Sequence, residues 1–259
     1  MRTKDKPRAF DLREDDVNNG KSSQPSLAEA WRAAAEADVS LGERLAMYRD
    51  ASRQLRPDFA EAYDLLIQRL AVLDRDEVGP QIGERLDEFE LPDQDGRLVS
   101  LSSLLRPGPA VISINRGHWC PYCRLELRSL AAIHDRISAL GARIVSIMPD
   151  SAGFTAGFAA ANELPFPILS DIDLGYSLSL GLIFWIGADV QRLYREAGVE
   201  LQKYHRNGGC FLPVAAKFIV GQDGRIAARE VNIEFRRRME PDAIVAAVQA
   251  LKPAVPEKR

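Results

Sequence analysis

Cysteine is scarce in this chain, whose 259 residues contain only three. That number is too small for a disulfide-built scaffold, because such folds are short and rich in cysteine. Charge of either sign is also not in excess: the net charge of -3 argues against a surface dedicated to nucleic acid. No apolar run approaches the length of a transmembrane helix, so no membrane partner is expected.

A secretory signal is also not visible, because residues 1–20 are charged and contain no apolar stretch. What is present is the composition of a globular protein, with 46% hydrophobic and 27% charged residues. We therefore expect a cytoplasmic protein. In that compartment a cysteine pair is more often redox-active or metal-binding than structural.

The first third of the chain divides into a tail and a helical region. Residues 1–24 are polar without periodicity, which predicts a flexible tail. Residues 25–83 form an N-terminal extension with three amphipathic helices, expected over 27–37, 41–55 and 59–74, and a charged linker. Each helix opens with a capping-box pattern, namely Ser26 with Glu29, Ser40 with Glu43, and Asp58 with Glu61.

The apolar faces of these three helices need a surface to cover them, because fewer than fifty residues build little core of their own. A homodimer is the interpretation favoured here, and a cap on the chain's own domain is the alternative. The residues concerned are Leu27, Trp31, Leu41, Leu45, Phe59, Leu65, Leu66, Leu70 and Leu73.

Residues 84–252 alternate between strand and helix patterns, before a short C-terminal tail over 253–259. This order predicts an α/β fold in which a mixed central sheet is flanked by helices. The predicted strands are 89–91, 98–101, 111–115, 142–148, 166–171, 216–220 and 225–231. The predicted helices are 121–140, 152–162, 173–182, 188–197 and 240–251.

The most informative segment is 111–123, which reads V-I-S-I-N-R-G-H-W-C-P-Y-C. A buried strand, a turn at Gly117 and a long amphipathic helix follow one another there. Cys120 falls at the helix N-terminus, with Pro121 at the first helical position. Unpaired backbone N–H groups and the helix dipole lower the pKa of a thiol in that place, which makes it a ready nucleophile.

The C-x-x-C pair has three meanings that the residues leave open. It is a redox dithiol, two ligands of a zinc site completed by Cys210 and His205, or a pair of inert buried cysteines. The strand–turn–helix context favours the redox interpretation. Within that interpretation Cys120, at the more exposed helix start, is the attacking thiolate, and the deeper Cys123 is its disulfide partner.

Four neighbours of the cysteines are candidates for supporting roles. Trp119 and Tyr122 are expected to shield the sulfurs, and Arg116 or His118 to stabilise the thiolate. The alternatives are a solvated arginine and a turn histidine. His134 and His205 are expected to be structural or solvated. The run Arg236–Arg238 is expected to be surface charge, with anion binding as the alternative.

With these residues in place, the chain resembles the alkyl hydroperoxide reductase/thiol-specific antioxidant (AhpC/TSA) family of the thioredoxin-fold superfamily. More narrowly, it is similar to peroxiredoxin-like proteins with an R-G-x-W-C-P-Y-C signature, here 116–123. The matching segments are D-E-F-E-L-P-D-Q-D-G-R-L-V-S-L-S-S-L-L (87–105), R-G-H-W-C-P-Y-C-R-L-E-L (116–127), F-P-I-L-S-D (166–171), L-P-V-A-A-K-F-I-V-G-Q-D-G-R-I (212–226) and M-E-P-D-A-I-V-A-A-V (239–248).

The resemblance implies a thioredoxin-like fold over about 84–252 and thiol-dependent reduction of hydroperoxides without a cofactor or metal. Cys120 matches the peroxide-attacking cysteine of the family. The implied partners are a hydroperoxide substrate and thioredoxin, glutaredoxin or another dithiol donor. The other interpretations are a thiol-disulfide oxidoreductase without peroxidase activity, and a zinc-stabilised or redox-sensing interaction module.

The sequence departs from the family pattern at three positions. Gly117 replaces the usual Thr or Ser, Ser113 replaces a proline, and Ala215 stands where peroxiredoxins have an arginine and other thioredoxin-like proteins a cis-proline. A weaker peroxidase than typical members is therefore expected. Arg116, Lys217 or Arg206 is a candidate for the missing positive charge. Cys210, just before the loop that faces the active cysteine in this fold, is either a second resolving thiol or a buried cysteine without chemistry.

Overall fold

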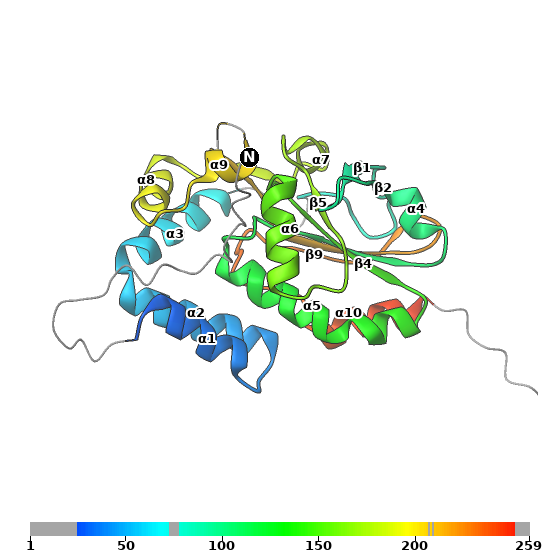
Figure 1. Ribbon diagram of the computed structural model, residues 1–259, viewed down its shortest axis with the longest axis horizontal. Helices are drawn as coiled ribbons and strands as arrows, with labels where there is room; N and C mark the ends of the chain where they lie inside the picture. The colour runs from blue at the N-terminus through cyan, green and yellow to red at the C-terminus, as the bar shows by residue number, and fades with distance from the viewer. Residues whose placement is uncertain (1–24, 73–77, 207, 209, 252–259) are drawn as a thin grey trace, which may run out of the picture.

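The computed structural model describes residues 25–72, 78–206, 208 and 210–251 (Figure 1). The predicted tails over 1–24 and 253–259 lie outside the described residues. Among the described residues, no helix is both long and apolar enough to cross a membrane.

Three helices form the N-terminal extension: α1 (Leu27–Glu36), α2 (Leu41–Leu55) and α3 (Pro57–Leu70). The first two capping boxes are confirmed, because the Ser26 and Ser40 hydroxyls accept from the backbone N–H of Glu29 and Glu43. The third is wrong. Helix α3 begins earlier, at Pro57, since proline suits the first helical position, and Asp58 pairs with the Arg56 side chain instead.

The central sheet is mixed, as expected, with strand order β5-β4-β3-β8-β9. Strand β3 lies in the middle, parallel to β4 and antiparallel to β8. All five residues of β3 are buried, which explains why its sequence is apolar except at Ser113. The strands are β5 (Ile168–Ser170), β4 (Arg143–Met148), β3 (Ala110–Ile114), β8 (Ala216–Val220) and β9 (Ile226–Val231).

Both faces of the sheet are covered. Along β3, Val111 packs with α5 (Pro121–Ala139) and α10 (Pro241–Ala250), whereas Ile112 and Ile114 join the apolar cluster of the other face. Helices α5 and α10 lie side by side beneath the sheet (Figure 1). The predicted helix 121–140 is confirmed almost residue for residue, including the turn at Gly141, where φ is +78°.

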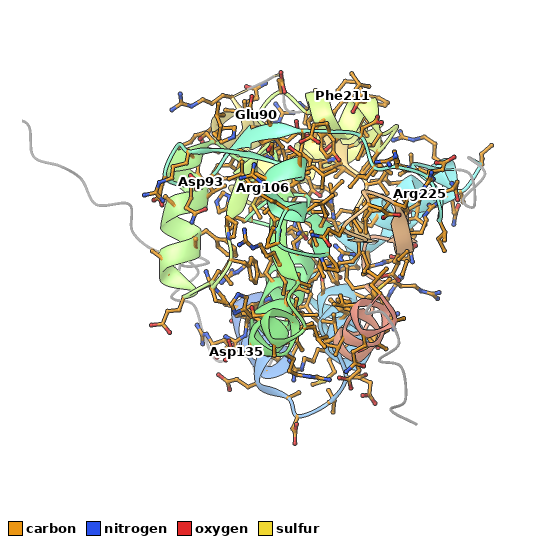
Figure 2. All side chains as sticks on the ribbon, turned by 90° about the vertical axis from the view of Figure 1, so that its right-hand side faces the viewer. Glu90, Asp93, Arg106, Asp135, Phe211 and Arg225 are labelled. Atoms are coloured by element: carbon orange, nitrogen blue, oxygen red, sulfur yellow. The ribbon has the colours of Figure 1, made fainter. Side chains whose placement is uncertain are left out.

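The remaining elements are short. The predicted hairpin around 89–101 is present as β1 (Glu90–Pro92) and β2 (Leu98–Ser100), but a single turn of helix, α4 (Leu101–Leu105), follows at once. The others are α6 (Ala152–Ala161), α7 (Gly175–Ser179), β6 (Ile183–Trp185), α8 (Ala188–Glu196), α9 (Leu201–His205) and β7 (Phe211–Pro213). The sequence did not predict β6, β7 or α9. Phe211 of β7 lies at the outer surface (Figure 2).

The extension packs on the chain's own domain. Helix α2 contacts α5, and α3 lies against α8 (Figure 1). The indole N–H of Trp31 donates to the carbonyl of Pro121 at 3.1 Å, and the Tyr48 and Tyr122 rings meet edge to face. The interpretation that these apolar faces need a second copy of the chain is therefore wrong. Most of these residues are buried within one chain, whereas Leu27 and Phe59 are only partly buried, Leu65 is 58% exposed, and Leu73 lies outside the described residues.

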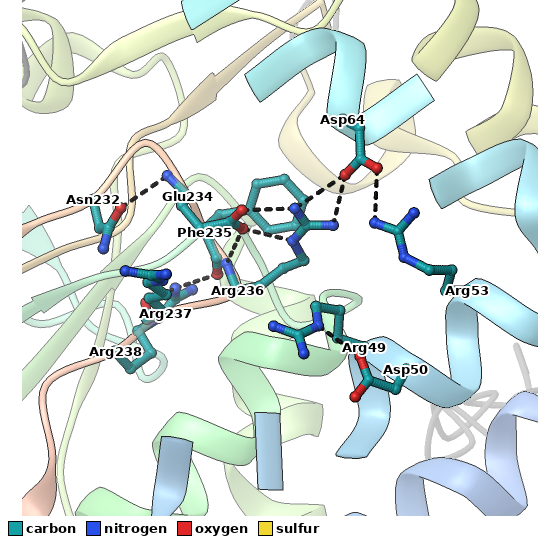
Figure 3. Close-up of polar contacts among 10 residues, drawn as sticks. All are labelled: Arg49, Asp50, Arg53, Asp64, Asn232, Glu234, Phe235, Arg236, Arg237 and Arg238. Atoms are coloured by element: carbon teal, nitrogen blue, oxygen red, sulfur yellow. Dashed lines mark hydrogen bonds and ion pairs between the residues drawn. The ribbon is translucent and has the colours of Figure 1, made fainter. Parts of the chain in front are cut away.

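Ion pairs join the extension to the end of the domain. Arg236 contacts Asp64 of α3 at 3.2 Å and Glu234 at 2.6 Å, and Asp64 also pairs with Arg53 of α2 (Figure 3). Arg236 is only 10% exposed, so the surface-charge interpretation of the arginine run is wrong at this position. These contacts fix helices α2 and α3 against the segment that precedes α10.

Candidate active site

The candidate site forms where the buried strand β3 gives way to helix α5. The backbone N–H of Cys120 donates to the carbonyl of Gly117 at 3.1 Å, which closes a tight turn, and Cys120 is the N-cap of α5. Gly117 has φ +141°, and a Cβ atom there would lie 2.4 Å from Nε1 of Trp119. Only glycine fits this turn, because both the backbone conformation and the space exclude a side chain.

Both cysteines are completely buried. The expectation that Cys120 is the more exposed of the two is therefore wrong. A helix N-terminus is open to solvent only where nothing packs over it, and here the N-terminal extension covers it. Trp31 of α1 donates a hydrogen bond to Pro121, the residue after Cys120, and Tyr48 of α2 contacts Tyr122.

The two thiols differ in acidity. Burial raises the pKa of the Cys120 thiol, but the hydrogen bond with Cys123 and the charges of Arg116 and Arg238 outweigh burial and lower that pKa to about 6. Burial and the hydrogen bond with Cys120 raise the pKa of Cys123 well above its usual value. At neutral pH the site therefore holds a Cys120 thiolate beside a Cys123 thiol.

Arg116 lies in the turn before the cysteines and is 1% exposed. Its guanidinium rests on the ring of Phe235, with 3.9 Å from Cζ to the ring centroid. One N–H donates to the hydroxyl of Tyr194 at 2.6 Å. Its charge contributes to the low pKa of Cys120, whereas a solvated surface arginine would not.

A buried ion network lies behind Cys123. The carboxylate of Glu126 accepts from Nζ of Lys217 at 2.6 Å and from Nε of Arg238 at 2.7 Å, and all three side chains are at most 4% exposed. A second N–H of Arg238 points to Sγ of Cys123 at 3.6 Å. Lys217 also donates to the Ser113 hydroxyl at 3.0 Å.

This network changes two expectations. Lys217 is engaged by Glu126, and the positive charges that chiefly lower the pKa of Cys120 are those of Arg116 and Arg238. Arg238 supplies that charge instead, so the expectation that it is surface charge is wrong. The sequence signal for this role of Arg238 was weak, because it is one arginine in a run of three and lies more than a hundred residues after the cysteines. Within the run, Arg237 alone is exposed.

The histidines fall into a separate cluster. His118 is held by Asp150, with 2.8 Å from Nδ1 to the carboxylate and a backbone N–H bond to the same side chain. His205 is fully buried, and burial lowers its pKa to about 4, so that it is neutral. Its Nε2 accepts from Nε1 of Trp119 at 3.4 Å. The charges that chiefly lower the pKa of Cys120 are those of Arg116 and Arg238.

The remaining candidates lie apart. Sγ of Cys210 accepts from Nε2 of Gln191 at 3.3 Å and contacts the Gly208 carbonyl. Arg206 is exposed, and His134 lies beside Asp135, which marks the outer face of α5 (Figure 2). In the described part of the chain, no three His, Cys, Asp or Glu side chains form a metal-binding group, so the zinc alternative gains no support.

A mixed sheet whose central strand leads into a C-x-x-C helix, with an acidic first cysteine, defines a thioredoxin-fold protein with a dithiol site. The profile of the AhpC/TSA family matches residues 82–229, and the chain belongs to that family. The match includes Arg116, Cys120 and Cys123 and leaves out α1–α3 and Arg238.

Known proteins agree with this assignment. A Mycobacterium tuberculosis (strain CDC 1551 / Oshkosh) protein named as a peroxiredoxin is 33% identical over 89 residues, which are 34% of this chain and 58% of that protein. The chloroplastic peroxiredoxin Q of Oryza sativa subsp. japonica is 32% identical over 89 residues, 34% of this chain and 41% of the rice protein. The chain thus spans about half the length of these curated relatives.

The fold itself is shared with a solved structure. The crystal structure of peroxidoxin BcpB from Mycobacterium tuberculosis superimposes with a TM-score of 0.52 at 21% identity, and the match covers 67% of this chain and 99% of that one. The thioredoxin-like fold expected from the sequence is therefore confirmed, together with a helical N-terminal extension.

Proposed function

We propose that this protein is a thiol peroxidase that reduces hydroperoxides through Cys120, with Cys123 as the resolving cysteine and Arg116 as a charge partner of the thiolate. The observation that carries this proposal is the acidity of Cys120. A buried thiol at an N-cap, hydrogen-bonded by a second thiol and near two arginines, is poised for nucleophilic attack.

The chemistry balances with these two sulfurs and an external dithiol. The Cys120 thiolate attacks the distal peroxide oxygen, the O–O bond breaks, and the leaving alkoxide takes a proton to become an alcohol, so that Cys120 becomes a sulfenic acid. The Cys123 thiol then displaces water from it and forms the disulfide. A dithiol donor such as thioredoxin or glutaredoxin reduces the disulfide and is itself oxidised.

Two further parts of the proposal concern the extent and the setting of the domain. We infer that the catalytic domain spans 84–252, with 25–83 as an extension that covers it. A reducing compartment such as the cytoplasm suits a redox-active C-x-x-C pair, because thiol-reducing systems there keep such a dithiol reduced between turnovers.

The experiment is peroxide consumption by the purified full chain with a thioredoxin system or dithiothreitol. Cys120→Ser should abolish turnover. Cys123→Ser should allow one round of reaction and leave a sulfenic acid that a dimedone probe traps. Cys210→Ser, which changes a third thiol outside the pair, is the matched control and should retain turnover. Loss of the first round in Cys123→Ser would contradict the assignment of roles.

A disulfide reductase without peroxidase activity is the second candidate. It is favoured by Gly117 and Ala215, which stand where peroxiredoxins have a hydroxyl side chain and an arginine to polarise the peroxide. Reduction of insulin disulfides without any consumption of hydrogen peroxide or an organic hydroperoxide would select this candidate.

A further inference from the structure

The Arg116 guanidinium is a buried cation without a carboxylate. It is 1% exposed, and across the described ranges no acidic side chain pairs with it. Its Nε has no hydrogen-bond partner there. Aromatic rings surround it instead, with the centroids of Phe235, Trp119 and Tyr63 at 3.9, 5.4 and 6.0 Å from Cζ. The N–H groups of such a cation need oriented acceptors, because a buried polar group without a hydrogen bond is costly.

One such acceptor is the hydroxyl of Tyr194, which Tyr63 holds in place by a second hydrogen bond. The Tyr194 oxygen accepts from Arg116 at 2.6 Å and from the hydroxyl of Tyr63 at 3.1 Å. Tyr194 lies on α8 and Tyr63 on α3, so neither residue belongs to the strand–turn–helix that carries the cysteines. The Tyr194 ring also packs against Trp119, with centroids 5.1 Å apart.

The two tyrosines thus restrain a long side chain that has many rotamers. The Tyr194 oxygen accepts two hydrogen bonds, so its two lone pairs point toward the Arg116 and Tyr63 donors. This geometry fixes the direction in which the Arg116 guanidinium lies. The Tyr63 ring packs on Phe235, with centroids 5.0 Å apart, so the ring beneath the guanidinium is held from the extension as well.

We propose that Tyr194 and Tyr63 are positioning residues, which hold Arg116 beside the Cys120 sulfur and so make the N-terminal extension part of the active site. The reactive thiol is assigned under the proposed function, and this inference rests on that assignment. It adds that helix α3, outside the family match, contributes to activating the thiol.

Several charged or titratable groups face Cys120, and those that a given variant does not change must be held constant in its test. They come from α2, α3, α5, α8, the turn before α5 and the segment before α10, and all are coupled electrostatically to its sulfur. They are Tyr48, Tyr63, Tyr122, Cys123, Arg124, Tyr194, Arg116 and Arg238.

The test removes single hydroxyl groups from the full-length protein. Tyr194→Phe and Tyr63→Phe take away the acceptor and its supporting donor. Tyr48→Phe is the matched control, because Tyr48 also lies near Cys120 and is 6% exposed, yet it contacts Tyr122 and not Arg116. The readout is the pH midpoint of Cys120 alkylation by iodoacetamide, measured by peptide mass spectrometry. This midpoint reports the thiolate and not the accessibility of the site.

Tyr194→Phe should raise the midpoint by about one pH unit, which is a tenfold loss of thiolate below the midpoint, and Tyr63→Phe by about half as much. Tyr48→Phe should leave it within about 0.2 of a unit of the unchanged protein. An equal shift in all three variants, or no shift in Tyr194→Phe, overturns the proposal.

A double-mutant cycle separates positioning from general packing. In an Arg116→Gln background the Tyr194→Phe shift should disappear, because the hydroxyl then has no guanidinium to hold. A shift of the same size in both backgrounds overturns the proposal. Alkylation uses no peroxide, so these outcomes are independent of whether the peroxidase assay succeeds.

Discussion

The ion network of Glu126, Lys217 and Arg238 allows a quantitative prediction. Glu126→Gln keeps the size of the side chain but removes the negative charge between two buried cations. Breaking a buried pair costs about 3–5 kcal/mol, because it leaves an uncompensated charge. Since Glu126 serves two partners at 2.6 and 2.7 Å, we expect the upper part of that range.

The assay is equilibrium unfolding in urea at pH 7, with an unchanged m-value as the sign that only stability has moved. The control is Asp242→Asn, which breaks a pair of similar length with Arg136, 2.8 Å, whose side chains are 54% and 85% exposed. That pair should cost less than about 1 kcal/mol. A loss below about 1 kcal/mol for Glu126→Gln as well would refute the reasoning.

The same network predicts a pH dependence. Burial raises the pKa of Glu126, but Lys217 and Arg238 outweigh it and hold that pKa below 4.5. A carboxyl with a lowered pKa in the folded state stabilises the protein above its unfolded pKa, and this contribution is lost as the pH falls through the folded pKa. The stability difference between the unchanged protein and Glu126→Gln should therefore shrink below about pH 4.5.

Three further predictions concern the turn and its cover. The alkylation rate of Cys120 should rise through about pH 6 and level off above it, while Cys123 stays unreactive to pH 8. If peptide mass spectrometry finds Cys123 alkylated before Cys120, the assignment of Cys120 as the thiolate is contradicted. Gly117→Ala should cost about 1–3 kcal/mol in thermal unfolding, because its Cβ would meet Trp119; an unchanged Tm would exclude this turn. Trp31→Ala should speed Cys120 alkylation by loosening the N-terminal extension, whereas the control Leu98→Ala, at a site 63% exposed, should leave the rate unchanged. Equal alkylation rates in Trp31→Ala and the unchanged protein would mean that α1 does not cover the thiol.

The local parts of the site could be predicted because their signals are contiguous. The strand before Cys120, the glycine turn, the proline at the first helical position and the helical period behind it all fall within 110–139. Each is a backbone preference or an amphipathic pattern that short-range sequence determines. The mixed sheet could be predicted because strand and helix patterns alternate along residues 84–252.

The parts that were missed depend on contacts between distant segments. Arg238 lies 115 positions from Cys123 in the chain, and nothing local distinguishes it from the exposed Arg237. The burial of Cys120 results from the packing of α1 and α2 over α5. Strands β6 and β7 have only three residues each and pair across a long connection. They are too short for an alternating hydrophobic pattern to predict them.

The acidity of Cys120 also sets how easily the oxidised pair accepts electrons. Only the reduced form carries the thiolate, so whatever stabilises that anion makes the disulfide a stronger oxidant. Lowering the pKa from 9.0 to about 6 favours the reduced pair at pH 7 by about 1.4 kcal/mol, or ~30 mV for two electrons. In the proposed cycle, the charges of Arg116 and Arg238 therefore widen the range of dithiols able to regenerate Cys120, including donors of only moderate reducing strength.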